Sequence, residues 1–108
     1  MNLLDITKLE IRPVRRQDHQ KISLFFKTNN ISQITRHFTP FQLNDKSARY
    51  ITRTDHKDPY YLALTQTQVI GLSMLRGWDE GFSTPSIGIL IDYRYHNKGI
   101  GRKLMNYT

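Results

Sequence analysis

The chain of 108 residues has no cysteine, so it can form neither a disulfide nor a zinc site with thiolate ligands. No apolar run is long enough to cross a membrane as a helix, and residues 1–5 lack the basic and apolar regions of a secretion signal. The sequence has no internal repeat and no low-complexity tract. These absences argue against secreted, membrane-spanning and repeat proteins. They predict a single cytoplasmic domain over residues 1–108, with no membrane partner.

Acidic residues are also scarce, since nine Asp and Glu stand against sixteen Lys and Arg, and the formal net charge is +7 at pH 7. Such an excess suits an anionic cofactor, a nucleic acid or an acidic membrane surface. The basic residues are nevertheless dispersed along the chain, and no recognised nucleic-acid motif organises them. We therefore predict a solvated surface for most of them. The exceptions, which could contact an anion, are three residues near the end of the chain: Lys98, Arg102 and Lys103.

Residues that commonly carry catalysis form few patterns in this sequence. The four histidines show no metal-ligand spacing, so no metal site is predicted. Asp79 and Glu80 lie between Gly77 and Gly81, in a loop with aromatic neighbours. This pair of carboxylates could hold a cationic amine or accept its proton. The alternative, which we favour, is that the glycines shape a turn and the carboxylates are solvated.

The first half of the chain predicts one strand followed by helices. Apolar and polar residues alternate over residues 9–14, as in a half-buried strand. Apolar residues then recur at helical spacing over residues 18–30, with Asp18 as the predicted N-cap. Two further helical segments are predicted, over residues 31–38 and, more weakly, over residues 44–51.

The second half of the chain predicts strands. Residues 60–64 and 69–75 are typical of two strands of a hairpin, which places three apolar side chains on one face: Ile70, Leu72 and Met74. After a loop, residues 87–91 form a run apolar enough to be a central strand.

A glycine-rich turn follows that run and opens a predicted helix, with Gly99 and Gly101 at its start. Such a turn directs several backbone N–H groups at one point, and the helix dipole behind them favours a phosphate. Glycine permits the close approach of the backbone and a positive φ. The spacing fits neither a P-loop nor a dinucleotide fingerprint, because Leu104 stands where the third glycine of the fingerprint belongs.

The strand, the bend and the segment from His96 to Gly101 resemble the acetyl-CoA loop of the GNAT N-acetyltransferases. That family's pattern is Arg or Gln, two residues, Gly, one residue, and then Gly or Ala at the start of a helix. His96 departs from the usual Arg or Gln, and Tyr93 stands where proline is common. The order of predicted elements also resembles the N-terminal portion of this family. The resemblance implies a fold that combines helices and strands (α/β, or more strictly α+β). Its sheet is mixed but mostly antiparallel and is flanked by helices, and the fold is incomplete at the C-terminus.

The resemblance also implies an activity, the direct transfer of an acetyl group from acetyl-CoA to a primary amine of a small molecule or protein. Acetyl-CoA is the expected co-substrate, and no metal is expected. Asp79 and Glu80 become the candidates to deprotonate the amine. The residues expected to bind acetyl-CoA are those of the strand and the loop: Leu90, Ile91, His96, Asn97, Lys98, Gly99, Ile100, Gly101 and Arg102.

In that family a further strand and helix follow the loop helix, and this sequence has no such segment after Thr108. We therefore expect a truncated domain, with little or no activity by the chain alone and an apolar strand edge that could support a homodimer. The alternative is a small basic module that binds nucleic acid or another anion without catalysis. We favour the acetyltransferase over nucleic-acid binding, and the sequence predicts no particular amine acceptor.

Overall fold

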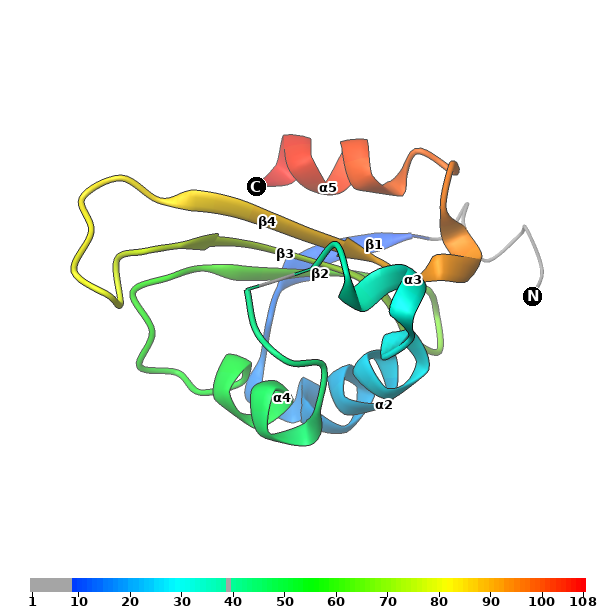
Figure 1. Ribbon diagram of the computed structural model, residues 1–108, viewed down its shortest axis with the longest axis horizontal. Coiled ribbons are helices and arrows are strands. Elements are labelled where there is room, and N and C mark those ends of the chain that lie inside the picture. The colour runs from blue at the N-terminus through cyan, green and yellow to red at the C-terminus, as the bar shows by residue number, and fades with distance from the viewer. Residues whose placement is uncertain (1–8, 39) are drawn as a thin grey trace.

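A computed structural model describes residues 9–38 and 40–108, so residues 1–5, considered above for a secretion signal, lie outside the described part. Helices cover both faces of one sheet (Figure 1). The sheet has the order β1-β2-β3-β4, and every pair of neighbours is antiparallel: β1 (Glu10–Pro13), β2 (Tyr60–Leu64), β3 (Val69–Arg76) and β4 (Ser86–Ile91). This arrangement confirms the predicted fold class.

Helices α2 (His19–Asn29), α3 (Ser32–Thr35) and α4 (Asp45–Ile51) lie on one side of the sheet, and α5 (Ile100–Tyr107) lies on the other (Figure 1). Two short 3-10 helices, η1 (Arg16–Asp18) and η2 (Tyr93–Tyr95), precede α2 and α5. In the described part of the chain, no helix is both long and apolar enough to span a membrane.

The larger core lies between the sheet and the helices α2 to α4. The apolar residues predicted at helical spacing, Ile22, Phe25 and Phe26, are buried there against strand residues such as Leu72 and Met74. Each large apolar side chain buried in this way contributes about 1.5–3 kcal/mol to folding. Prediction of α4 is confirmed, and the side chain of Asn44 caps it by accepting a hydrogen bond from the backbone N–H of Ser47 at 2.9 Å.

The helix predicted over residues 31–38 is shorter in the structure, where α3 has only four residues. Asp18 immediately precedes α2 as predicted, but its side chain does not cap that helix. Its carboxylate instead accepts hydrogen bonds from both Nη atoms of Arg12, each at 2.8 Å, and from the N–H of Arg15 at 2.7 Å. Burial raises the pKa of Asp18, but these hydrogen bonds outweigh burial and leave the pKa lowered. The pair therefore fastens β1 to the start of α2.

A bulge between β2 and β3 overturns one prediction. Ala63 pairs with Gly71 and Leu64 pairs with Val69, so Ile70 is an extra residue on β3. Its side chain lies on the α5 side of the sheet, in the second cluster of buried residues, and not with Leu72 and Met74. One inserted residue is enough to reverse the face, because side chains alternate along a strand.

Close packing of α5 onto the sheet depends on Gly71. A Cβ atom there would lie 3.1 Å from Cδ1 of Ile91, 3.2 Å from Cβ of Ala63 and 3.3 Å from Cδ2 of Leu104. These approaches are tighter than ordinary van der Waals contact, so glycine lets the helix lie directly on the strands.

Strand β4 is apolar enough for a central strand, but it is at the edge of the sheet formed by the described residues, which agrees with the expected apolar strand edge. Its only described neighbour is β3, and Ile87 in its first half is 50% exposed. The outer side of β4 therefore presents backbone N–H and C=O groups that no described strand pairs with.

Candidate functional site

The connection from β4 to α5 is shaped by two residues with positive φ, Asn97 at 63° and Gly99 at 78°. Gly99 occupies the N-cap position of α5 in the left-handed conformation. This conformation costs a residue with a side chain about 1–2 kcal/mol. A Cβ atom at Gly99 would meet nothing within 4 Å, so the backbone conformation, and not space, accounts for glycine here.

The start of α5 carries backbone N–H groups that the described residues leave open. The N–H of Lys103 donates to the carbonyl of Gly99 at 3.2 Å and so begins the helical pattern. Among residues 9–38 and 40–108, none accepts from the N–H groups of Ile100, Gly101 and Arg102, and Gly99 has no side chain to cap them. With the helix dipole behind them, these groups form a site for an anion.

Gly101 leaves the approach to these N–H groups unobstructed. A Cβ atom at this position would meet only Cγ1 of Ile91, at 3.8 Å, which is an ordinary contact. Packing within the chain therefore does not require glycine at position 101.

The segment before Gly99 is fastened to the end of β4. The Nε2 atom of His96 donates a hydrogen bond to the carbonyl of Ile91 at 2.9 Å. This contact closes the turn between the strand and the helix. His96, which stands where Arg or Gln is usual in the resembling pattern, therefore stabilises the conformation of the turn. Lys98 and Arg102 are exposed on either side of the open N–H groups, and neither forms an ion pair with a described residue.

Asp92 and Asn29 anchor the loop, and the sequence analysis missed both. The buried carboxylate of Asp92 accepts hydrogen bonds from the N–H of Arg94 at 2.9 Å, and from its Nε and Nη2 atoms at 3.0 and 2.8 Å. Asn29 of α2 accepts from the N–H of Tyr93 at 2.9 Å and donates to the carbonyl of Phe25. Burial raises the pKa of Asp92, but the hydrogen bonds from Arg94 outweigh it and leave the pKa lowered. The sequence did offer one signal for Asp92, since it is an acidic residue directly after an apolar strand.

The loop between β3 and β4, which contains Asp79 and Glu80, is held by buried Asp58. The Asp58 carboxylate accepts hydrogen bonds from three successive backbone N–H groups, those of Gly77 at 3.2 Å, Trp78 at 2.8 Å and Asp79 at 3.3 Å. The donors at the start of this loop are therefore already satisfied within the chain.

Asp79 is itself engaged in the same connection. Its carboxylate accepts from the N–H of Lys57 at 2.7 Å, from the N–H of Asp58 at 3.4 Å and from Nδ1 of His56 at 3.2 Å. The hydrogen bond from the backbone of Lys57 is the largest of the effects that hold the pKa of Asp79 below its usual value. A carboxylate stabilised as an anion is a weak base, so these contacts favour an architectural role. Glu80 differs from Asp79, since its side chain is 55% exposed and, among the described residues, its carboxylate pairs with one group, Nη2 of Arg76, at 3.5 Å.

The structure brings the predicted acetyl-CoA residues together and separates them from the predicted catalytic pair. Residues His96 to Arg102 lie at the carboxyl end of β4, and Asp79 and Glu80 lie in the loop before its first residue (Figure 1). The five steps of β4 separate these two ends by about 17 Å. Among the described residues, no group of three or more His, Asp or Glu could hold a metal ion.

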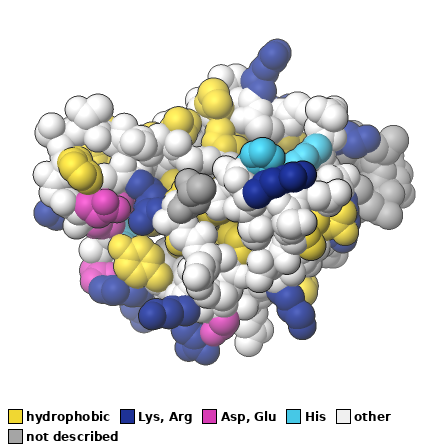
Figure 2. Space-filling model, viewed as in Figure 1, with side chains coloured by type: hydrophobic (Ala, Val, Ile, Leu, Met, Phe, Trp, Pro, Cys, Tyr) yellow, Lys and Arg dark blue, Asp and Glu magenta, His cyan; other side chains and the backbone are white. Residues whose placement is uncertain are grey.

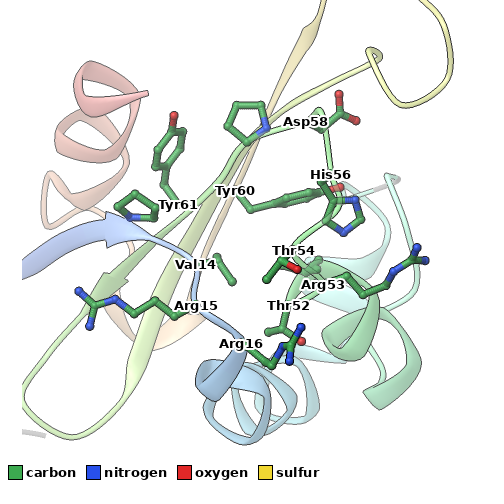
Figure 3. Close-up of a pocket in the computed structure, with 13 residues that line it drawn as sticks. Val14, Arg15, Arg16, Thr52, Arg53, Thr54, His56, Asp58, Tyr60 and Tyr61 are labelled. Atoms are coloured by element: carbon green, nitrogen blue, oxygen red, sulfur yellow. The ribbon is translucent and has the colours of Figure 1, made fainter.

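Two cavities lie at the end of the sheet opposite the glycine loop. One, of about 370 Å³, is formed by the β3–β4 loop, the first half of β4 and Pro40. The other, of about 350 Å³, lies between the end of β1 and the connection from α4 to β2 (Figure 3). In the second cavity the guanidinium groups of Arg15 and Arg53 point away from each other, and Arg53 is paired with Asp55 (Figure 3). A third arginine, Arg16, also lines this cavity, and no recognised nucleic-acid motif organises these residues.

Comparison with known proteins agrees with this geometry. The model of the acetyltransferase (GNAT) family matches residues 28–108. The chain therefore belongs to the GNAT acetyltransferase family, as the resemblance of the glycine loop predicted. No match was found among curated proteins.

Solved structures of this family share the fold at low sequence identity. A GNAT-family acetyltransferase from Streptococcus pneumoniae superimposes with a TM-score of 0.70 and 17% identity, over 92% of this chain and 64% of that chain. An N-acetyltransferase from Staphylococcus aureus gives 0.65 and 21%, over 92% and 62%. The ribosomal-protein-S5-alanine acetyltransferase from Vibrio fischeri gives 0.67 and 17%, over 93% and 61%. The chain thus spans less than two thirds of each of these three structures.

Proposed function

We propose that this chain is the acetyl-CoA-binding portion of an enzyme that transfers an acetyl group from acetyl-CoA to a primary amine. The observation that carries the proposal is the open row of N–H groups at Ile100, Gly101 and Arg102, behind Gly99, in a chain of the GNAT family. These N–H groups have no hydrogen-bond acceptor among the described residues, and a negatively charged group would supply one.

The pyrophosphate of acetyl-CoA is the group that fits the glycine loop. The backbone N–H groups from Gly99 to Arg102 donate to its oxygens, and a small residue at position 101, here Gly101, leaves the approach open. Lys98 and Arg102 add positive charge on either side. Asn97 and His96 contribute by shaping the turn, through a positive φ and the bond to Ile91.

The outer edge of β4 suits the pantetheine arm. The amides of the pantetheine arm need hydrogen-bond partners that lie in line, and the outer edge of β4, which no described strand pairs with, offers backbone donors and acceptors. Leu90 and Ile91 remain the predicted contacts, although the carbonyl of Ile91 already accepts a hydrogen bond from His96. This placement directs the thioester along β4, away from the loop and toward the first half of the strand.

Transfer requires a neutral amine nitrogen to attack the thioester carbonyl carbon. The carbon–sulfur bond then breaks, and the thiolate leaves and takes up a proton. The chain contributes by holding the two reactants in place, and a backbone N–H of β4 polarises the carbonyl. Glu80 and Asp79 remain the predicted acceptors of the amine proton, with Glu80 the stronger candidate because its carboxylate is exposed and weakly paired.

Two further expectations stay predictions. We place the protein in the cytoplasm, where acetyl-CoA and amine acceptors are both available to an enzyme of this family. The free edge of β4 could also pair with a second copy of the chain, and acetyl-CoA would then compete with dimer formation.

The proposal is tested by the thermal midpoint of the purified chain with acetyl-CoA and, as a matched control, with pantetheine, which has no pyrophosphate. Acetyl-CoA at a hundredfold its Kd stabilises the folded chain by about 2.7 kcal/mol. We expect a clear shift with acetyl-CoA and a far smaller one with pantetheine. Equal shifts, or none with acetyl-CoA, would contradict binding on the glycine loop.

A further inference from the structure

We propose that the cavity beside the first half of β4 takes an amine acceptor that also carries a carboxylate, and that Arg76 selects it. The inference rests on the proposed function, because it identifies the cavity with the acceptor side of the same reaction. The substrate class it names is an α-amino acid, or the amino-acid-like end of a larger molecule.

The position of the cavity makes it the natural neighbour of the thioester. Ile87 and Gly88 of β4 form one wall, and Pro40 and the β3–β4 loop form the others. Gly88 is three residues, or about 10 Å, from Ile91 along the strand. With pantetheine on the second half of β4, the thioester end points toward this cavity.

Arg76 is held in place before any ligand binds. Its Nη1 atom donates to the carbonyl of Pro40 at 2.6 Å, and its guanidinium carbon lies 5.5 Å from the centre of the Phe41 ring. The side chain is only 25% exposed. A planar guanidinium fixed in this way offers its remaining N–H groups in a set direction.

The remaining donors of Arg76 lack partners. Its Nε atom is buried without a hydrogen-bond partner, the one such side-chain atom found in residues 9–38 and 40–108. Its Nη2 atom reaches Glu80 only at 3.5 Å, the outer limit of a hydrogen bond. The edge formed by Nε and Nη2 matches the two oxygens of a carboxylate, and burying a donor without a partner is unfavourable.

Glu80 supplies the complementary charge. Its carboxylate is exposed and weakly bound, so it can leave Nη2 when the ligand's carboxylate replaces it, and it can then receive the ligand's ammonium group. Arg76 and Glu80 together fit a group with both charges. The proton that the ammonium loses passes to Glu80, which leaves the neutral amine that the reaction needs.

The rest of the cavity has an apolar part, and Thr84 and Ser86 add hydroxyl groups to its wall. Phe82 is 62% exposed and Ile87 is 50% exposed, and both line it. On the visible face, hydrophobic, acidic and basic side chains lie next to one another at the left end, over the β3–β4 loop (Figure 2). A volume of about 370 Å³ suits a small molecule, so we expect an amino acid with an apolar side chain to fit best.

The test is calorimetric titration of the chain with matched pairs of probes that differ only in the carboxylate: leucine with leucinamide, and phenylalanine with phenylalaninamide. We expect each acid to bind at least about tenfold more tightly than its amide, as a charge-assisted contact predicts. The preference disappears in Arg76→Gln and is reduced in Arg76→Lys, which lacks the planar fork. Arg49→Gln, on α4 and away from the cavity, keeps the preference as the control.

The acetyl-CoA shift, measured on the same samples, separates the two proposals. Equal binding of acid and amide, or no binding of either at millimolar concentration, overturns the role of Arg76 even where acetyl-CoA shifts the midpoint. An acid preference without any acetyl-CoA shift overturns the proposed function, and the assignment of the cavity as its acceptor site falls with it. The comparison of acid with amide in the parent chain decides the matter even where Arg76→Gln fails to fold.

Discussion

The loops on either side of β4 both combine glycines with charged residues, yet they use their backbone N–H groups in opposite ways. In the loop before the strand, Asp58 accepts hydrogen bonds from the N–H groups of Gly77, Trp78 and Asp79. In the loop after it, the N–H groups of Ile100 and Gly101 find no acceptor among the described residues. The first loop is complete in itself, and the second lacks an anion.

This difference shows how a structural loop is told from a binding loop. A buried carboxylate that accepts three N–H groups plays the part in the first loop that we assign to a pyrophosphate in the second. Charged residues and glycines occur in both, so composition does not separate them. What separates them is whether the chain supplies its own acceptor.

The largest effect on the first loop is expected from Asp58→Ala. The substitution leaves three backbone N–H groups of the β3–β4 loop without their acceptor, so we expect the free energy of unfolding to fall by about 3 kcal/mol. Chemical denaturation measures this loss. Glu80→Ala, at an exposed position of the same loop, is the control and should change stability by less than about 0.5 kcal/mol. Equal stability of the two variants would refute the role of Asp58.

The second loop is tested by Arg94→Met, which removes the cation paired with buried Asp92. Breaking a buried pair costs about 3–5 kcal/mol, and the partial exposure of Arg94 reduces our expectation to about 2 kcal/mol. The variant should also lose stability at a higher pH than the parent, because the pKa of Asp92 rises when Arg94 is absent. Denaturation curves at several pH values measure both effects.

In the parent chain we expect stability to fall in acid. The pKa values of Asp18 and Asp92 are lowered in the folded chain relative to the ordinary value of 3.8, so the unfolded chain binds more protons in this range. Their contribution is complete well above 3.8 and is lost as the pH falls below about 4. A thermal midpoint that stayed constant from pH 5 to about pH 2 would contradict these two pairs.

A smaller effect distinguishes the two glycines of the second loop. Gly99→Ala forces a side chain into the left-handed conformation, and should lower the free energy of unfolding by about 1–2 kcal/mol. Gly101→Ala meets only an ordinary contact inside a helix, so it should be neutral or raise stability by up to about 1 kcal/mol. Thermal unfolding without ligand compares the two, and a larger loss for the change at Gly101 would reverse our assignment of their roles.

Local features of the sequence predicted the glycine loop and the order of the elements. Gly99 and Gly101 begin α5 as expected, because a glycine turn before an apolar helix is encoded within a few residues. The face of Ile70 could not be predicted, since a bulge inserts a residue that periodicity does not reveal. The apolar composition of β4 did not show how many strands pair with it or how exposed it is, since only Leu90 of this strand is buried.

The anchors of the two loops were missed for a related reason. Asp58 contacts residues about twenty positions later, and Arg76 donates to Pro40 across 36 positions. Such partners are set by the packing of whole elements and leave no local pattern. Asp79 and Glu80 attracted attention as a pair, but only the structure showed that Asp79 is engaged by Lys57 and His56.

The account's central claim is that the open N–H groups at the start of α5 bind the pyrophosphate of acetyl-CoA. The most direct test is the Kd for acetyl-CoA of Gly101→Glu beside Gly101→Ala. Glutamate in the first turn favours the helix but opposes the pyrophosphate, so we expect a folded chain whose Kd rises at least about tenfold. Alanine, which the family pattern accepts, should leave the Kd unchanged. An unchanged Kd in the glutamate variant would place the ligand elsewhere.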